Sequence, residues 1–275
     1  NFSMLGDAKI WLAAAGQIFF TLSIGMGTLS AYASYLKEKD DIALGAVSAS
    51  FLNEFAEVIL GATIAIPVAV AFFGLTTTQE IALGGAFNLG FVSMPIIFQN
   101  MPLGEIFGFL WFLMLFLAGI TSSVAMAQPI ISFLEEQFGF SRNKATSIVG
   151  ACIFVGVNLV VIFFQYGFLD EMDYWSGTFA LVIVALIEVV IFAWIFGMDK
   201  GWKEINKGAE IKIPKIFYFI IKYITPVYLL AILVSWTIQD AIPIFLMKNI
   251  PAEEIPYRWL SRGFMVLIAI ALLLM

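Results

Sequence analysis

The sequence predicts an all-α integral membrane protein with seven transmembrane helices. Of its 275 residues, 61% are hydrophobic and 12% are charged, whereas an average soluble domain has about 25% charged residues. A transmembrane helix needs about 20 predominantly apolar residues, and polar breaks divide the chain into seven apolar runs. A water-soluble enzyme is disfavoured, because it would need more polar residues to cover its surface.

Charge and residue inventory narrow the function classes further. The net charge is −6, which argues against a nucleic-acid partner, because nucleic-acid-binding proteins carry a basic face. The chain has no histidine and one cysteine, so it can form neither a histidine-based site nor an internal disulfide. No pairing of a nucleophile with a base stands out, and we expect no enzymatic activity.

The seven predicted spans follow the apolar runs in order. Their expected ranges are about 10–35, 43–73, 104–134, 145–166, 175–198, 216–238 and 257–275. The break between the second and third spans is uncharged except for Glu80. A solvated loop would be more polar, so we expect this segment to form short helices packed into an outward-facing vestibule; an ordinary loop is the alternative.

Basic residues predict the orientation in the cell membrane. Most of the lysines and arginines follow the first, third and fifth spans: Lys37, Lys39, Arg142, Lys144, Lys200, Lys203, Lys207, Lys212 and Lys215. The breaks after the second and fourth spans hold none, and the break after the sixth holds Lys248 and Arg258. Because cytoplasmic loops are enriched in lysine and arginine, we expect the N-terminal end outside and the C-terminal end inside.

The first span contains a signal for a helix break in mid-membrane. Gly25 and Gly27 follow Thr21 and Ser23; glycine weakens a helix, and hydroxyl groups can satisfy the freed backbone groups. A break would expose helix ends and carbonyl groups to a bound ion or charged solute. Close packing of helices through small residues is the alternative explanation.

Polar side chains also interrupt the next two spans. Asn53 and Glu57 are four residues apart and share one helix face; an ionisable group inside a membrane usually marks a pathway or a partner, unless it reaches water near a helix end. In the third span, consecutive hydroxyl groups at 121–123 offer oxygen ligands to a small cation such as Na⁺, although such hydroxyls often bond to their own helix. Asp170, Glu171 and Asp173 precede the fifth span, where acidic residues usually cap a helix.

Motifs along nearly the whole chain resemble one transporter family. They are GQIFFTLSIGMG (16–27), YASY (32–35), LNEFAEVILG (52–61), FNLGF (87–91), AGITSS (118–123), QPIISFLEE (128–136), LDEMDYWSGT (169–178), WIFGMDKGWKEINKG (194–208) and YITPVYL (223–229). In this order they resemble the C-terminal portion, the sixth to twelfth transmembrane helices, of the neurotransmitter:sodium symporter family. The likeness is to its bacterial amino-acid-transporting branch, which has the leucine-transporter fold.

This resemblance implies a domain organisation. Residues 1–200 correspond to the second of two inverted five-helix repeats, with the long extracellular loop at about 74–103. Residues 201–275 correspond to a cytoplasmic loop and two additional transmembrane helices. The first repeat is then missing from this chain, which we expect to be part of a longer, prokaryotic protein and not to transport on its own.

The resemblance also assigns site residues. Substrate-binding positions are Phe20, Thr21, Ser23, Met26, Ser122 and Met126. Ligands of a first sodium site are Thr21 and Asn53, and ligands of a second are Ala118 (by its carbonyl), Thr121 and Ser122. Gate positions are Phe20 as the lid, Asp173 as the outer carboxylate, Glu136 where the inner carboxylate is usually aspartate, and Ser34 and Tyr35 as inner supports. Methionines 26 and 126 replace the Phe and Ile of the leucine-selective pattern, which predicts a more adaptable pocket.

The predicted function is sodium-coupled symport of hydrophobic L-amino acids by alternating access. The fixed carboxylate of Glu57, with Gln17 as a neighbouring donor, stands where chloride-dependent members have serine, which predicts chloride independence and suggests proton counter-transport as a hypothesis. The alternatives are a ligand-binding membrane receptor or a channel subunit without coupled transport, and a scaffold without a bound solute. A scaffold would leave the intramembrane polar residues unexplained.

Overall fold

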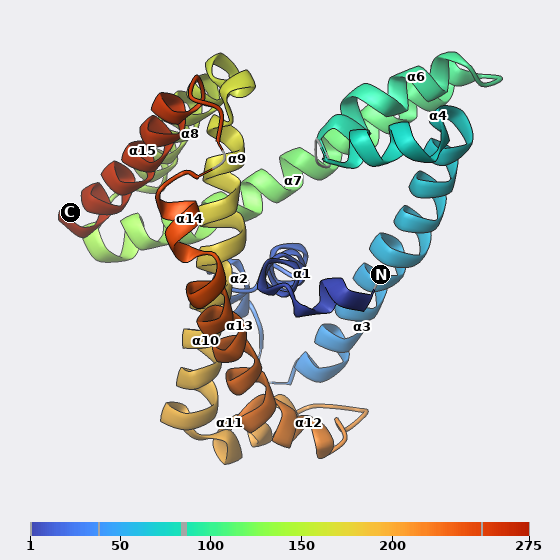
Figure 1. The fold of residues 1–275 in the computed structure, drawn as a ribbon. Helices are drawn as coiled ribbons and strands as arrows, with labels where there is room; N and C mark the ends of the chain where they lie inside the picture. Colours follow the sequence, from blue (N-terminus) through green and yellow to red (C-terminus); the bar gives the residue numbers. More distant parts are fainter. Residues whose placement is uncertain (1, 38, 84–86, 249, 275) are drawn as a thin grey trace. The chain divides into compact units, whose positions relative to one another are not determined.

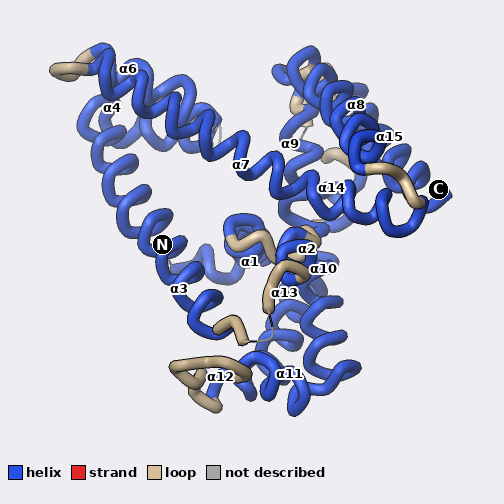
Figure 2. The backbone as a smooth tube through the Cα atoms, turned by 180° about the vertical axis from the view of Figure 1, so that it is seen from behind, coloured by secondary structure: helices blue, strands red, loops and turns tan. Residues whose placement is uncertain are grey.

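The computed structural model describes residues 2–37, 39–83, 87–248 and 250–274, and within these ranges every regular element is a helix (Figures 1 and 2). Six helical stretches of the described chain are long and apolar enough to cross a membrane: Ile42–Ala82, Gly104–Phe138, Arg142–Ile162, Phe168–Ile205, Ile216–Gln239 and Ile255–Leu274. They correspond to the second to seventh predicted spans. The first predicted span is interrupted, and together these elements are consistent with seven transmembrane helices.

The first span is broken where the glycine pattern predicted. After the 3-10 turn η1 (Phe2–Gly6), helix α1 covers Ala8–Thr21 and helix α2 covers Thr28–Ala33. Between them Ser23, Gly25 and Gly27 have φ angles of 57°, 77° and 74°. A right-handed helix cannot continue through three left-handed residues, so the chain is non-helical between the two helices.

The second span ends at a glycine. It comprises α3 (Ile42–Glu54), the π-helical η2 (Phe55–Ala62) and α4 (Thr63–Leu83), and the helical backbone is interrupted inside α4 at Gly74 (φ 75°, ψ 165°). This is one residue beyond the predicted end of the span. The following segment contains the remainder of α4, η3 (Asn88–Ser93) and α6 (Met94–Gln99), which confirms short helices in place of an ordinary loop.

The remaining spans lie close to their predicted positions. The third and fourth are α7 (Gly104–Phe138) and α8 (Arg142–Ile162), followed by the short turn η4 (Phe164–Tyr166). The fifth is built from α9 (Phe168–Met172), η5 (Asp173–Phe179), α10 (Ala180–Val190), η6 (Ile191–Gly197) and α11 (Met198–Ile205). The sixth is built from α12 (Ile216–Phe219), η7 (Ile220–Ile224) and α13 (Thr225–Gln239), and after α14 (Ala241–Phe245) the seventh is α15 (Ile255–Leu274).

The capping role expected for the acidic residues of the fifth span is wrong. Helix α9 begins at Phe168, seven residues before the predicted start of the span, and its N-cap is Gly167 in the left-handed conformation. No side chain makes a capping hydrogen bond there. Asp170 and Glu171 lie in the first turn, and Glu171 is buried. Both carboxylates instead face arginines of α15: Asp170 lies 4.0 Å from Arg258, and Glu171 pairs with Arg258 and Arg262.

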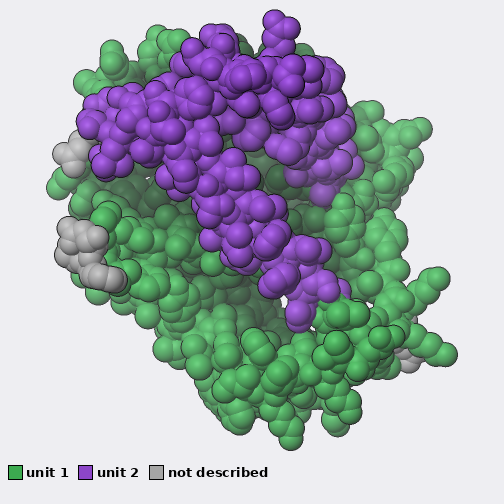
Figure 3. Space-filling model, turned by 90° about the vertical axis from the view of Figure 1, so that its right-hand side faces the viewer, with its two compact units in different colours: residues 1–44, 126–275 green, residues 45–125 purple. Residues whose placement is uncertain are grey.

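The chain forms two compact units (Figure 3). The first contains residues 1–44 and 126–275, and the second contains residues 45–125. In the first unit, α1, α10 and α13 share a core in which Leu12, Val182, Leu229 and Trp236 are buried. Many large apolar side chains of the spanning helices are exposed, as lipid-facing surfaces require.

A polar contact joins two distant loops of the first unit. The carboxylate of Asp41, just before α3, accepts the backbone N–H of Glu210, which follows α11, at 2.8 Å, and the N–H of Leu44 at 2.8 Å. A Cβ atom added to Gly208 would lie 3.0 Å from the carbonyl oxygen of Lys39. The two loops therefore pack closely, and the backbone hydrogen bonds, that from Leu44 above all, lower the pKa of the Asp41 carboxyl.

Candidate functional site

The non-helical break in the first span is the centre of the candidate site. Phe20 and Thr21 end α1, and the N–H groups of Leu22 and Ile24 still bond back to Ile18 (3.1 Å) and Phe19 (2.8 Å). The helical ladder resumes when Ala31 donates to the carbonyl of Gly27 at 2.9 Å. Because the C-terminal end of a helix carries partial negative charge, the end of α1 favours a cation or an ammonium group beside the break.

Glycines bring this break directly against the fifth span. A Cβ atom at Gly16 would lie 2.9 Å from Cγ2 of Thr178 in η5, and a Cβ atom at Gly25 would lie 3.1 Å from the carbonyl oxygen of Leu181 in α10. Gly27 packs against α7, because its added Cβ would lie 3.3 Å from Cβ of Pro129. Helix α1 therefore packs against η5, and the break itself is held against α10 and the second half of α7.

The predicted substrate-binding residues fall into both units. In the first unit Phe20 is 43% exposed, Thr21, Ser23 and Met26 are half-buried, and Met126 in α7 is exposed. Ser122 belongs to the second unit and is exposed on α7. Phe20, Thr21, Ser23 and Met26 lie at or beside the break in the first unit, whereas Ser122 lies in the second.

Asn53 and Glu57 form the pair that their spacing predicted. The side-chain amide of Asn53 donates to Oε2 of Glu57 at 3.3 Å, and both side chains are half-buried in the second unit. The pair bridges the junction of α3 and the π-helical η2, where the wider turn begins at Phe55. Gln17 lies on α1 of the first unit and is exposed.

The hydroxyl groups of α7 bond to their own helix. Oγ1 of Thr121 donates to the carbonyl of Leu117 (2.8 Å) and lies 3.1 Å from that of Ala118, and Oγ of Ser123 donates to the carbonyl of Gly119 (2.7 Å). The structure therefore contains the local bonds that the sequence left as an alternative. A hydroxyl that donates its hydrogen still has lone pairs, so its oxygen can also accept a cation.

The predicted gate residues are exposed side chains near the ends of spans. Asp173 begins η5, and its Oδ1 lies 2.7 Å from where a Cβ of Gly177 would be. Glu136 is exposed near the end of α7, whereas its neighbour Glu135 pairs with Arg142 (3.5 Å). On the loop after α2, Ser34 donates to the carbonyl of Ala31 (2.6 Å) and Tyr35 is exposed.

Sequence reasoning missed a buried ion cluster in the first unit. Glu171 of α9 pairs with Nη1 of Arg258 (3.2 Å) and Nε of Arg262 (2.6 Å), both on α15. Arg258 also pairs with Glu254 at 2.8 Å. Arg258, counted from sequence with the break before the seventh span although that span's predicted range begins at 257, lies inside the last helix. The sequence signal for this cluster is two arginines four residues apart beside an apolar run, because such arginines demand a carboxylate partner.

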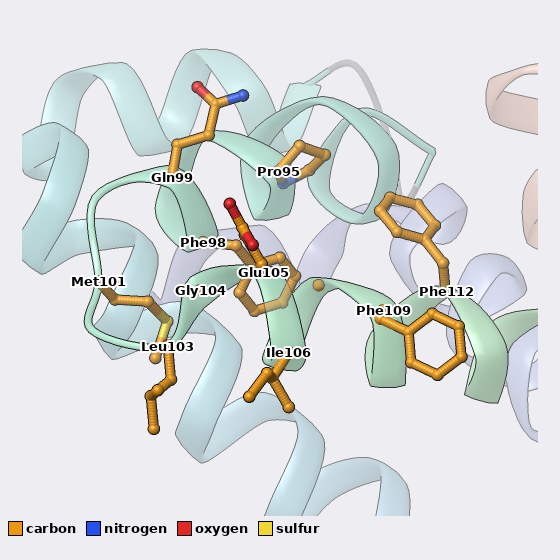
Figure 4. A pocket seen from close by; sticks show the side chains of 11 residues that line it. Pro95, Phe98, Gln99, Met101, Leu103, Gly104, Glu105, Ile106, Phe109 and Phe112 are labelled. Carbon is orange, nitrogen blue, oxygen red and sulfur yellow. The ribbon is translucent and has the colours of Figure 1, made fainter.

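A separate cavity of about 660 Å³ lies in the second unit, between α6 and the first turns of α7 (Figure 4). Its walls include Pro95, Phe98, Ile106 and Phe109, with Glu105 as a charged member. None of the predicted substrate, sodium or gate residues lines it. This cavity is therefore distinct from the candidate site at the break.

Known proteins share both the sequence and the fold. An uncharacterized sodium-dependent transporter of Methanocaldococcus jannaschii is 32% identical over 233 residues, covering 84% of this chain and 47% of the relative. The human sodium- and chloride-dependent neutral and basic amino acid transporter B(0+) is 27% identical over 247 residues, covering 87% of this chain and 38% of the relative. The crystal structure of MhsT in complex with L-phenylalanine matches with a TM-score of 0.76 and 26% identity, covering 86% of this chain and 54% of that chain.

These matches confirm the predicted fold. The chain spans about half the length, or less, of the curated relatives it matches, which is consistent with a C-terminal portion of the leucine-transporter fold. The family model that matches covers residues 1–275 and describes sodium-coupled transporters, not enzymes. The chain thus belongs to the sodium:neurotransmitter symporter family.

Proposed function

We propose that the intact transporter containing this chain couples Na⁺ entry to the uptake of hydrophobic L-amino acids by alternating access. The observation that carries this proposal is the break between α1 and α2, where three left-handed residues interrupt a helix in mid-span. In transporters of the leucine-transporter fold, discontinuous helices place their ends and free backbone groups at the substrate and ion sites. The L-phenylalanine bound by MhsT supports the substrate class.

Phe20, Thr21, Ser23 and Met26 form one wall of the proposed substrate pocket, and Ser122 and Met126 form the opposing wall. Methionine is unbranched and polarizable, so the two methionines allow the pocket to fit aromatic as well as branched aliphatic side chains. The aromatic ring of Phe20, exposed at the end of α1, serves as the lid.

Two sodium sites adjoin this pocket, and the first repeat completes each of them. Thr21 and Asn53 are ligands of one site; the carbonyl of Ala118 and the hydroxyls of Thr121 and Ser122 are ligands of the other. These are neutral oxygens, which suit a monovalent ion, whereas calcium sites usually recruit several carboxylates.

Glu57 makes transport independent of chloride. Its carboxylate accepts the amide of Asn53, so a fixed negative charge lies beside a ligand of the first sodium site, with Gln17 as a further donor. The human and mouse relatives are chloride-dependent by name. When Na⁺ and substrate leave, an ionisable group inside the membrane without a neighbouring cation is costly, and counter-transport of a proton on the return step would offset that cost.

The chain supplies the second repeat and the two additional helices of a multi-pass protein of the prokaryotic cell membrane, with its N-terminal end outside and its C-terminal end inside. Asp173 acts at the outer gate and Glu136 at the inner gate, where Ser34 and Tyr35 support it. Both carboxylates are exposed in this chain, as partners from a first repeat require. The partners are the bilayer, the amino-acid substrate and that first repeat, without which the chain does not transport.

Uptake into proteoliposomes tests the proposal. The intact protein should accumulate labelled L-phenylalanine when an inward Na⁺ gradient is imposed, and accumulation should cease when Na⁺ is replaced by K⁺. Replacing chloride by gluconate should leave uptake unchanged, and residues 1–275 alone should show none. Equal uptake with and without the Na⁺ gradient would refute coupled transport.

A further inference from the structure

Two carboxylates that are two residues apart in the fifth span have opposite environments. The side chain of Glu171 is 7% exposed and ion-paired, whereas Asp173 is exposed. Because a helix has 3.6 residues per turn, side chains two positions apart differ in direction by about 200°. A constraint that turns Glu171 toward one side therefore turns Asp173 toward the other.

The constraint on Glu171 comes from three directions. Arg258 and Arg262 approach its two oxygens from α15, and the indole N–H of Trp175, one turn further along, donates to Oε1 at 2.6 Å. Helices α9 and α15 lie side by side (Figure 1). Both oxygens of Glu171 are therefore occupied, which fixes the rotation of the helix that carries it.

The arginines are themselves held in place. Arg262 donates to the carbonyls of Phe245 (2.9 Å) and Ile244 (3.0 Å) in α14. Gly167 makes room for Arg258, because a Cβ atom there would lie 2.5 Å from Nη2 of the arginine. The buried hydroxyl of Ser261 also donates to the carbonyl of Phe168 at 3.1 Å. The last two helical elements thus form a rigid support for α9.

The side chain of Asp173 packs closely against Gly177, one turn further along the same helix. Its Oδ1 would be 2.7 Å from a Cβ atom at Gly177, so any larger residue at 177 would displace the carboxylate. Asp173 is also the first residue of the π-helical η5. The position of this carboxylate is therefore set by the rotation of α9 and by the free space at Gly177.

The geometry points to Glu171 as a positioning residue for the outer gate: its pairs with Arg258 and Arg262 hold α9 so that Asp173 faces away from α15. This inference rests on the proposed function, in which Asp173 closes the gate over the substrate. It gives the last helix a role in transport, since a helix outside the five-helix repeat determines where the gate carboxylate points.

The dissociation rate of substrate from the intact transporter tests this role. Purified protein is loaded with labelled L-phenylalanine in Na⁺ and chased with unlabelled substrate. Asp173→Asn should speed dissociation, and Glu171→Gln should speed it on the order of tenfold, the effect of losing about one charge-assisted hydrogen bond at the gate. The double variant should dissociate no faster than Asp173→Asn alone, because both changes remove the same interaction.

A matched control removes a different carboxylate from the same cluster. Glu254→Gln takes away one carboxylate partner of Arg258, which also lies 4.0 Å from Asp170, but leaves both arginines on Glu171, so dissociation should stay at the wild-type rate. An equal acceleration in this control would overturn the specific role of Glu171 in favour of a general loosening of α15.

The outcomes separate the inference from the proposed function. If Asp173→Asn speeds dissociation but Glu171→Gln does not, the positioning role of Glu171 is wrong, and the assignment of Asp173 to the gate is unaffected. The same conclusion follows if the effects of the two substitutions add in the double variant. If Asp173→Asn has no effect, the gate assignment itself fails, and the positioning role fails with it, while the Na⁺ dependence of uptake still tests symport. If Glu171→Gln does not fold, Arg258→Lys replaces it in the test. The role is supported if Arg258→Lys speeds dissociation and adds nothing further in a double variant with Asp173→Asn. The role is overturned if Arg258→Lys leaves the dissociation rate unchanged.

Discussion

Gly25 is the position at which the break in the first span can be tested most directly. Its φ of 77° is left-handed, and alanine in that conformation costs about 1–2 kcal/mol. The added Cβ atom would also lie 3.1 Å from the carbonyl oxygen of Leu181, which prevents the backbone from moving closer to α10. Gly25→Ala should therefore destabilise the broken conformation by at least this amount.

The consequence for binding follows from that free energy. If substrate binds only the broken conformation, and the competing unbroken conformation is close to it in free energy, a loss of about 1–2 kcal/mol raises the dissociation constant by up to about 5- to 30-fold. Equilibrium binding of labelled L-phenylalanine to the intact protein in Na⁺ measures this change, and thermal unfolding verifies that the variant is folded. The matched control is Gly150→Ala in α8, where no atom lies within 4 Å of the added Cβ and alanine favours the helix by up to about 1 kcal/mol. An unchanged dissociation constant in Gly25→Ala would refute the reasoning.

Four further predictions concern other residues. Glu57→Ser should create a chloride requirement for sodium-dependent binding, and equal binding in gluconate would show that the carboxylate does not replace chloride. Met26→Phe should shift preference from aromatic toward small aliphatic amino acids, because each methylene group that fits the pocket contributes about 1–3 kcal/mol of binding free energy. If tryptophan competes equally well with both proteins, Met26 does not line the pocket. Thr121→Ala combined with Ser122→Ala should weaken Na⁺-dependent binding, and an unaltered Na⁺ titration would contradict the second sodium site. The lowered pKa of Asp41 contributes stability above the ordinary carboxyl value of 3.8 that is lost as pH falls below it, so the difference in unfolding temperature between wild type and Asp41→Ala should shrink in acid; a constant difference would contradict the hydrogen-bonded carboxylate.

Features set by neighbouring residues could be predicted from the sequence. Gly25 and Gly27 predicted the break, because the conformational freedom of glycine is a local property. The turn at Gly74 ended the second span within one residue of the prediction. The contact between Asn53 and Glu57 followed from helix periodicity alone. The substrate, sodium and gate roles came from family resemblance, and they stay predictions.

Features set by distant partners could not be predicted in this way. Glu171 precedes the predicted fifth span, where an acidic residue is expected to cap the helix. Its partners are instead 87 and 91 residues further along the chain. No local pattern connects these positions, so burial of the carboxylate depends on tertiary packing of α15 against α9. The same reason explains why the fifth span begins at Phe168: its first turn is stabilised by the last helix, which a search for apolar runs does not consider.

The contact between Asp41 and Glu210 has a consequence for biosynthesis. The two residues are 169 positions apart, and a ribosome adding 5–20 residues per second needs about 10–30 s to make that length of chain. During this interval Glu210 has not yet been synthesised, so Asp41 cannot accept its N–H. The loop before α3 therefore lacks this contact while four more spans enter the bilayer. Closure of these two loops is therefore a late step in assembly, and pulse-labelled chains released before residue 210 should retain a protease-sensitive loop at 39–41.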